Sequence, residues 1–225
     1  MPPDREQGVF ETMLVRNGRI HALGQHLERL AHSVAALYGT RLPTDLPRRL
    51  RDHTAGLTGE HRLRVDAVPG REVDITARPI AAGYRASVRL EPLVIPGGLG
   101  PHKWRDRRLL ETRPADPAPL LVDADGTVLE AAWGNVWLLE GDRLITPPAD
   151  GRILPGVTRA LLLALAPSLG LSPGEEPISL HRMRAASCAF ATSAIRLAVP
   201  ATLSGCPAGW VGTVSAVHRI RAALS

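Results

Sequence analysis

Lysine is almost absent from this chain of 225 residues. Of its 27 basic side chains only Lys103 is a lysine, so the other 26 (27 − 1) are arginines. Wherever a positive charge suffices the sequence uses arginine, and a retained lysine therefore indicates a need for a primary amine. Unlike a guanidinium, a desolvated amine can lose its proton and attack a carbonyl group. Lys103 is the candidate covalent anchor, and the alternative is that one lysine was kept by chance.

Cysteine is also scarce. The two thiols, Cys188 and Cys206, are too few for a disulfide framework and lack the spacing of metal ligands, so we expect both to be reduced and structural. The eight histidines contain no HExxH or similar paired spacing. The sequence therefore predicts no metal site.

Long apolar runs and aromatic clusters are missing as well. No run reaches the length of a membrane span, and residues 1–7 lack the basic and apolar regions of a signal peptide. Although the formal charge is +5 and the sequence pI about 10.2, the arginines are spread among 22 acids without a basic, aromatic-rich block. We expect a cytoplasmic protein that binds neither membrane nor nucleic acid. An anionic small molecule would account for the charge equally well.

Residues 1–80 predict a small α/β domain, followed by a linker at residues 81–85. Alternating apolar residues indicate strands, and apolar residues at helical spacing indicate helices. The predicted elements are a strand over residues 8–15, a hairpin turn at residues 16–19, a helix over residues 26–38 ended by Gly39, a helix within residues 44–57 with Thr44 as N-cap, and a hairpin of residues 62–67 and 73–77.

Residues 86–225 predict a larger, strand-rich domain. The expected elements are a strand over residues 86–95, a short helix ending near Leu110, an antiparallel meander over residues 120–146, a helix that begins after Gly156, strands over residues 187–192 and 196–201, and a closing helix over residues 213–224. No internal repeat is visible.

Three polar features point to a ligand. Glu130 lies among apolar residues, where a carboxylate needs a partner, either a structural cation or a cationic ring nitrogen of a ligand. The helix start at Gly156, Val157 and Thr158 offers backbone N–H groups and the positive end of the helix dipole, which suit a phosphate, although many such starts bind nothing. Arg29 lies beside the apolar stripe of its helix, from which it projects either into a cleft or into solvent.

Taken jointly, these features suit a ligand with an aldehyde, a basic ring nitrogen and a phosphate, and pyridoxal 5'-phosphate has all three. The sequence resembles the fold-type IV pyridoxal-phosphate family, which contains the class IV aminotransferases of branched-chain and D-amino acids and aminodeoxychorismate lyase. The resemblance covers nearly the whole chain in order, through Gly8-Val9-Phe10-Glu11-Thr12, His26-Leu27-Glu28-Arg29-Leu30 with Ser33, His102-Lys103 with Asp106-Arg107, Glu130 to Asn135, Thr146-Pro147-Pro148, and Leu154-Pro155-Gly156-Val157-Thr158-Arg159.

The resemblance implies a role for each candidate. Lys103 would form a Schiff base with the cofactor aldehyde and act as the catalytic base, and Glu130 would pair with the ring nitrogen. Arg29, Val157 and Thr158 would hold the phosphate. The implied fold is α/β (α+β), with a small α/β domain, a larger pseudo-barrel domain, the cofactor in the cleft between them, and a homodimer as the assembly.

Two motifs favour one branch of the family. The run from Lys103 to Asp106 and Arg107 resembles the Lys-x-x-Asn-Arg of the lyase, and Thr192-Ser193-Ala194 also looks more like the lyase than the aminotransferases. We therefore expect a lyase of folate biosynthesis that eliminates pyruvate from 4-amino-4-deoxychorismate and leaves 4-aminobenzoate. The alternatives are a class IV amino-acid aminotransferase and a non-catalytic member. Arg107, with Arg105 and Arg196, is a candidate ligand of the substrate carboxylates.

Overall fold

The chain folds into two compact units. The computed structural model describes residues 2–81, 84, 87–111, 116–204 and 213–225, so Cys206 lies outside the described part. The first unit comprises Met1–Tyr84 and His102–Arg107, and the second comprises Arg85–Pro101 and Arg108–Ser225. Residues 102–107 fall within the predicted larger domain, but in the structure they pack with the first unit.

The first unit is an antiparallel sheet with helices. Its described strands follow the order β2-β1-β3-β4. The elements are a 3-10 turn at Arg5–Gln7, β1 (Val9–Arg16), β2 (Arg19–Ile20), α1 (Leu23–Tyr38), α2 (Leu46–Thr54), β3 (Glu60–Ala67) and β4 (Asp74–Pro79). At the β1–β2 turn Asn17 and Gly18 have φ angles of 46° and 76°, which is the backbone that an Asn-Gly hairpin favours.

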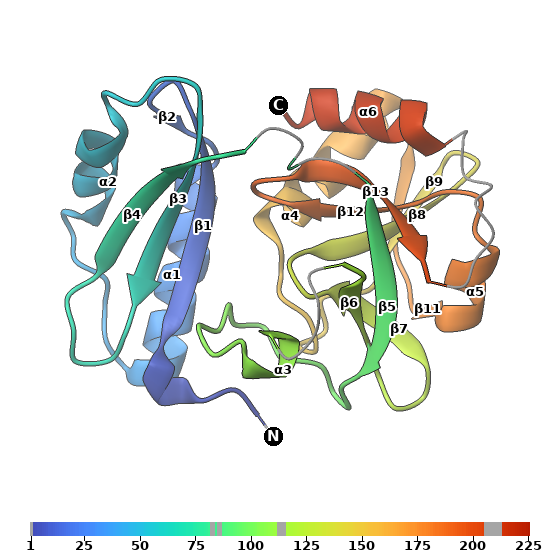
Figure 1. The fold of residues 1–225 in the computed structure, drawn as a ribbon, viewed down its shortest axis with the longest axis horizontal. Coiled ribbons are helices and arrows are strands. Elements are labelled where there is room, and N and C mark those ends of the chain that lie inside the picture. The colour runs from blue at the N-terminus through green and yellow to red at the C-terminus, as the bar shows by residue number, and fades with distance from the viewer. Residues whose placement is uncertain (1, 82–83, 85–86, 112–115, 205–212) are drawn as a thin grey trace. The chain divides into compact units, whose positions relative to one another are not determined.

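The packing of this unit follows the strand period. Val9, Met13 and Val15 point to one face of β1 and are fully buried, and α1 packs along that strand (Figure 1). Helix α1 ends where expected, since Gly39 adopts the left-handed conformation that closes helices. The prediction that Thr44 is the N-cap of the second helix is wrong, because Asp45 occupies that position. Helix α2 begins at Leu46, with proline in its first turn, where the missing N–H costs nothing.

The second unit contains a long curled sheet. Its described strands follow the order β10-β9-β8-β12-β13-β5-β6-β7-β11. The elements are β5 (Val88–Val94), α3 (Arg108–Glu111), β6 (Ala118–Val122), β7 (Thr127–Ala131), β8 (Asn135–Glu140), β9 (Arg143–Thr146), α4 (Val157–Leu165), a 3-10 turn at Ala166–Leu169, β10 (Ser172–Glu175), β11 (Ile178–Ser179), α5 (Leu180–Ala185), β12 (Ala189–Ser193), β13 (Leu197–Leu203) and α6 (Thr213–Ala223).

The expected antiparallel meander is only partly correct. Strands β6 and β7 pair antiparallel, as do β8 and β9, but β12, β13 and β5 lie between β8 and β6 in the sheet. The free edge of β8 pairs with β12 instead, with Asn135 opposite Thr192. An isolated bridge from Ala131 to Gly134 joins β7 back to the start of β8, so six strands curl into a barrel-like layer. The curled sheet of the second unit is the predicted pseudo-barrel, and the first unit is the predicted small α/β domain.

The second unit has two main apolar clusters. One fills the inside of the curled sheet, and the other lies between β8, β12 and β13 and the helices α4 and α6. Figure 1 shows α6 lying across β13. Trp137 and Phe190 stack in the second cluster, with ring centroids 5.9 Å apart. Among the described residues, no helix has both the length and the apolar character that a membrane crossing requires.

Candidate active site

Lys103 lies on a short strand that is added to the sheet of the first unit. The backbone N–H of Phe10 donates to the Lys103 carbonyl at 2.9 Å, and that of Arg105 donates to the Gly8 carbonyl at 3.0 Å. Val9 and Trp104 form the antiparallel bridge between these bonds. Strand β2 pairs only with residues 15 and 16 at the other end of β1. The lysine strand therefore occupies the edge of β1 that β2 leaves open.

The side chain of Lys103 is half-buried against an aromatic ring. Its Nζ atom lies 4.9 Å from the centroid of Phe10, and the guanidinium carbon of Arg64 lies 3.8 Å from the same centroid. Both cations are attracted by the ring quadrupole. The amine is thus held on a packed surface, as a covalent anchor requires.

Arg29 belongs to a buried ionic cluster in the same unit. Its Nε and Nη2 atoms donate to the two carboxylate oxygens of Glu11 at 2.7 and 2.9 Å, and the same carboxylate lies 2.8 Å from Nδ1 of His26. Glu11 is 1% exposed and stands on the buried face of β1. A bidentate pair of this kind fixes the guanidinium of Arg29 in position.

The charge states of this cluster follow from its contacts. Burial would raise the pKa of Glu11, but the Arg29 charge and the hydrogen bonds from His26 and Arg29 outweigh it and hold that pKa at about 2. Burial lowers the pKa of His26, and the charges of Arg29 and Lys103 add to the effect against the opposing influence of Glu11. At neutral pH His26 is therefore an uncharged donor to an ionised Glu11.

Glu130 lies in the second unit, on β7 opposite Leu121 of β6. It is 7% exposed, and both of its carboxylate oxygens lie 3.3 Å from the backbone nitrogen of Leu154. These are long, shared hydrogen bonds, weaker than those a buried carboxylate forms with a cation. A protonated ring nitrogen as a further partner of Glu130 stays a prediction from the sequence.

The start of α4 is shaped by Asn135. The side-chain amide of Asn135 donates to the Leu154 carbonyl at 3.0 Å, and a Cβ atom on Gly156 would lie 2.0 Å from its Oδ1. A side chain at position 156 would therefore force the Asn135 amide to move. Among the described residues, none accepts a hydrogen bond from the backbone N–H of Val157 or Thr158. With the buried Thr158 hydroxyl, these groups form a donor set that fits a phosphate.

The sequence-predicted residues therefore fall into two groups. Arg29, Lys103 and Arg107 belong to the first unit, whereas Glu130, Val157 and Thr158 belong to the second. Their roles stay predictions. Sequence reasoning missed the buried contacts of Glu11 with Arg29 and His26. The available signal for Glu11 was its position on the apolar side of β1.

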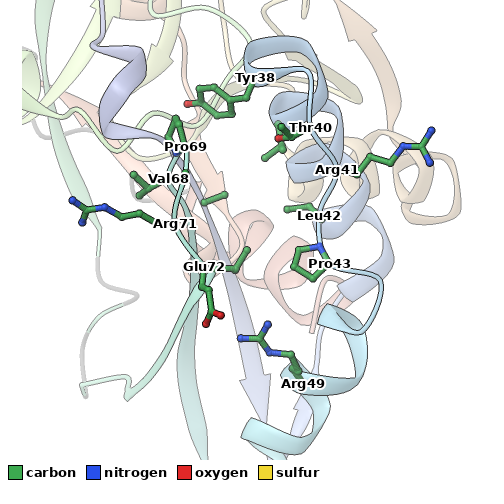
Figure 2. Close-up of a pocket in the computed structure, with 14 residues that line it drawn as sticks. Tyr38, Thr40, Arg41, Leu42, Pro43, Arg49, Val68, Pro69, Arg71 and Glu72 are labelled. Atoms are coloured by element: carbon green, nitrogen blue, oxygen red, sulfur yellow. The ribbon is translucent and has the colours of Figure 1, made fainter.

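One cavity of about 630 Å³ lies elsewhere in the first unit. It is formed by the end of α1, the following loop, α2 and the β3–β4 turn, and none of its lining residues is a predicted site residue. Figure 2 shows that Arg41 and Arg71 extend away from this hollow. Because none of the predicted site residues lines this cavity, it is not the candidate site. Among the described residues, no group of His, Cys, Asp or Glu could hold a metal ion.

Substitution of Gly134 tests how closely the start of β8 packs against β12. A Cβ atom at this position would lie 2.1 Å from the carbonyl oxygen of Thr192, which is backbone and cannot rotate away. We expect Gly134→Ala to destabilise the protein by about 1–3 kcal/mol, measured by denaturant unfolding. The matched control is Gly24→Ala in α1, where no atom lies within 4 Å and alanine should be neutral or stabilising. Equal stability of both variants would contradict this packing.

An amine, a buried carboxylate and a helix start with phosphate-binding capacity are the groups that an enzyme dependent on pyridoxal phosphate requires. The comparisons with known proteins agree. The family model for amino-transferase class IV matches residues 8–91 and 101–203, and the chain belongs to this family. Its members are pyridoxal-phosphate-dependent enzymes, which confirms the predicted enzyme class and cofactor.

Individual relatives support the same assignment. A protein of Rickettsia typhi, named a probable branched-chain-amino-acid aminotransferase, is 26% identical over 82% of this chain and 73% of its own length. A hypothetical aminotransferase of Mycobacterium tuberculosis in a PLP-bound form superposes with a TM-score of 0.81 at 24% identity, over 98% of this chain and 88% of that one. A protein of Legionella pneumophila, assigned provisionally as a 4-amino-4-deoxychorismate lyase, gives a TM-score of 0.76 at 20% identity, over 90% and 86%. The two structural likenesses establish the fold.

Proposed function

We propose that this chain is a pyridoxal-phosphate-dependent lyase that releases pyruvate from 4-amino-4-deoxychorismate and leaves 4-aminobenzoate. The observation that carries the proposal is the turn after β12. The Thr192 hydroxyl accepts a hydrogen bond from the Trp137 indole at 2.9 Å within the core, and Ala194 has no hydroxyl. Because residue 194 is alanine, the turn lacks the side-chain hydroxyl with which the Thr-Asn-Ser-like run of the aminotransferases ends.

The same turn carries a positioned cation. The guanidinium of Arg196 lies 4.6 Å from the centre of the Trp133 ring, and the Arg196 backbone N–H donates to the Ser193 hydroxyl at 3.2 Å. Leu197 has a φ of 58°, a strained value for a residue with a side chain. A stacked guanidinium directs its in-plane N–H groups outward, as carboxylate recognition requires. Arg196 thus suits the carboxylates of the proposed substrate.

The other residues have the following proposed roles. Lys103 would hold the cofactor through its aldehyde, and the same amine would carry the proton between substrate atoms. Glu130 keeps the ring nitrogen protonated, and Arg29 with the Val157 and Thr158 N–H groups holds the phosphate. When bound, the cofactor supplies an electron sink for the bond-breaking step. A homodimer, as the resemblance implies, is part of the proposal.

The second candidate is a class IV amino-acid aminotransferase. It is favoured by the names of relatives such as the Rickettsia protein, which describe branched-chain-amino-acid aminotransferases. An aminotransferase must convert the bound cofactor to its amine form with a single amino acid, whereas a lyase releases pyruvate without a second substrate.

One pair of assays separates the two functions. The purified holoprotein is mixed with 4-amino-4-deoxychorismate, and release of pyruvate and 4-aminobenzoate is followed. In parallel, branched-chain and D-amino acids are added singly, and conversion of the cofactor to pyridoxamine phosphate is followed by absorbance. We expect stoichiometric pyruvate and 4-aminobenzoate, with slow or no conversion by amino acids. Fast conversion without 4-aminobenzoate would establish the aminotransferase, and a cofactor-bound protein inactive in both assays would favour a non-catalytic member.

A further inference from the structure

The face of the first sheet that carries Lys103 also carries a buried carboxylate. Asp66 lies on β3 directly opposite Phe10 of β1, and Phe10 in turn is hydrogen bonded through its backbone to Lys103. Asp66, Phe10 and Lys103 therefore form one row across three neighbouring strands. Side chains in such a row stand on the same face of a sheet and contact one another. Asp66 is 7% exposed.

Asp66 is bound by two arginines. Nε and Nη2 of Arg64 donate to its two carboxylate oxygens, each at 2.7 Å, and this guanidinium also covers the Phe10 ring. Nε of Arg105 lies 2.7 Å from Oδ1 of Asp66. The carboxylate thus holds one cation from its own strand and one from the lysine strand, only two residues beyond Lys103.

Gly8 makes the second of these contacts possible. It lies opposite Arg105 in the added strand pair, and its missing side chain lets Arg105 pass across β1 to reach Asp66. Gly8 has a φ of 89°, and a Cβ atom there would lie 2.4 Å from the Ala67 carbonyl oxygen. The close approach of β1 and β3 at this point and the reach of Arg105 therefore depend on the same glycine.

We propose that Asp66 is a positioning residue for Lys103, acting through Arg105. Two backbone hydrogen bonds pair the lysine strand with the edge of β1, and short edge pairs of this kind are weak. Side-chain contacts add to them, among them the donation from Nη1 of Arg105 to the Gln7 carbonyl at 3.0 Å and that from the Asp4 backbone N–H to Asp106 at 2.8 Å. The Asp66–Arg105 ion pair clamps the strand from the sheet face and fixes where the lysine side chain lies over Phe10. The position of this strand matters because a displacement of about 1 Å at a reacting group can lower a rate by about 100-fold. The inference rests on the proposed role of Lys103 as the cofactor anchor.

The test measures the rate of Schiff-base formation at Lys103. Because the chain has no other lysine, side-chain labelling by the cofactor can be assigned to this residue. The cofactor-free protein is mixed with pyridoxal phosphate, the absorbance change is timed, and borohydride reduction followed by peptide mass analysis confirms that Lys103 carries the label. The variants are Asp66→Asn, Arg105→Gln and the double variant. The control is Asp52→Asn, which removes the same charge from an exposed pair with Arg48 on α2. Circular dichroism selects a temperature at which all variants are folded.

We expect each single variant to form the Schiff base about 10-fold more slowly, the double variant to be no slower than either, and Asp52→Asn to be unchanged. Non-additivity of this kind shows that Asp66 and Arg105 act as one unit, which a general loss of stability would not produce. If Asp66→Asn unfolds, Arg105→Gln alone carries the test, because Arg105 is partly exposed. Normal labelling rates in the folded variants would overturn the proposed role of Asp66 but would leave Lys103 as the cofactor anchor. A wild-type protein without label on Lys103 would overturn both this role and the proposed cofactor anchor.

Discussion

Replacing Lys103 with alanine is expected to abolish the near-visible absorbance of the bound cofactor and to reduce turnover by at least about 10⁴-fold, because one amine serves as covalent anchor and proton carrier. No other lysine exists in the chain to substitute for it. The measurement is the absorbance spectrum of the purified variant after addition of pyridoxal phosphate, together with the pyruvate assay.

Lys103→Arg is the matched variant for this prediction. It keeps the positive charge above Phe10 but has no amine that can form a Schiff base at any working pH. We expect the same loss of absorbance and turnover as with alanine, whereas non-covalent cofactor binding should be retained better. Persistence of the absorbance band in either variant would show that Lys103 is not the anchor.

Replacing Glu11 with glutamine is expected to destabilise the protein by about 3 kcal/mol or more at neutral pH. The substitution leaves the half-buried guanidinium of Arg29 without its bidentate carboxylate, and breaking such a pair by removing one partner typically costs about 3–5 kcal/mol. Urea unfolding measures the loss. Glu28→Gln on the exposed side of α1 is the control, and we expect it to change stability by less than about 0.5 kcal/mol.

The pH dependence gives this prediction a second readout. The pKa of Glu11 falls from 4.5 to about 2 on folding, so its contribution is fully present above pH 4.5 and is lost as the pH falls toward 2. A shift of this size corresponds to about 3 kcal/mol. The stability of Glu11→Gln should therefore fall less steeply between pH 4.5 and 2 than that of the unsubstituted protein. Parallel curves would contradict the ionised state of Glu11.

Local signals in the sequence predicted most individual elements. The apolar run of β1, the Asn17-Gly18 turn and the helix stop at Gly39 depend on neighbouring residues, and all three are present in the structure. Sheet order was less predictable. Strand β8 pairs along four residues with β12, whereas an isolated bridge at Ala131 and Gly134 joins it to β7. Nothing near residue 134 in the sequence reveals the distant partner β12.

The candidate site shows the same division. The scarcity of lysine singled out Lys103, and apolar neighbours singled out Glu130, which the structure places in a buried position. Other contacts of the first unit join residues from distant segments of the chain, and the sequence did not predict them. The pairing of Arg29 with Glu11 depends on the docking of α1 against β1, and the pairing of Asp66 with Arg105 depends on a strand added from residues 102–107. Pairwise contacts of this kind carry no local sequence pattern.

The added strand has a consequence for dissecting the protein. A fragment that stops at residue 84 would retain β1 to β4 but would lose the segment that covers the backbone of Gly8 and Phe10. Their carbonyl and amide groups would then form an open sheet edge, which is a template for association with other chains. Expression of that fragment should give aggregates, whereas grafting residues 102–107 back through a flexible tether should restore a monodisperse species.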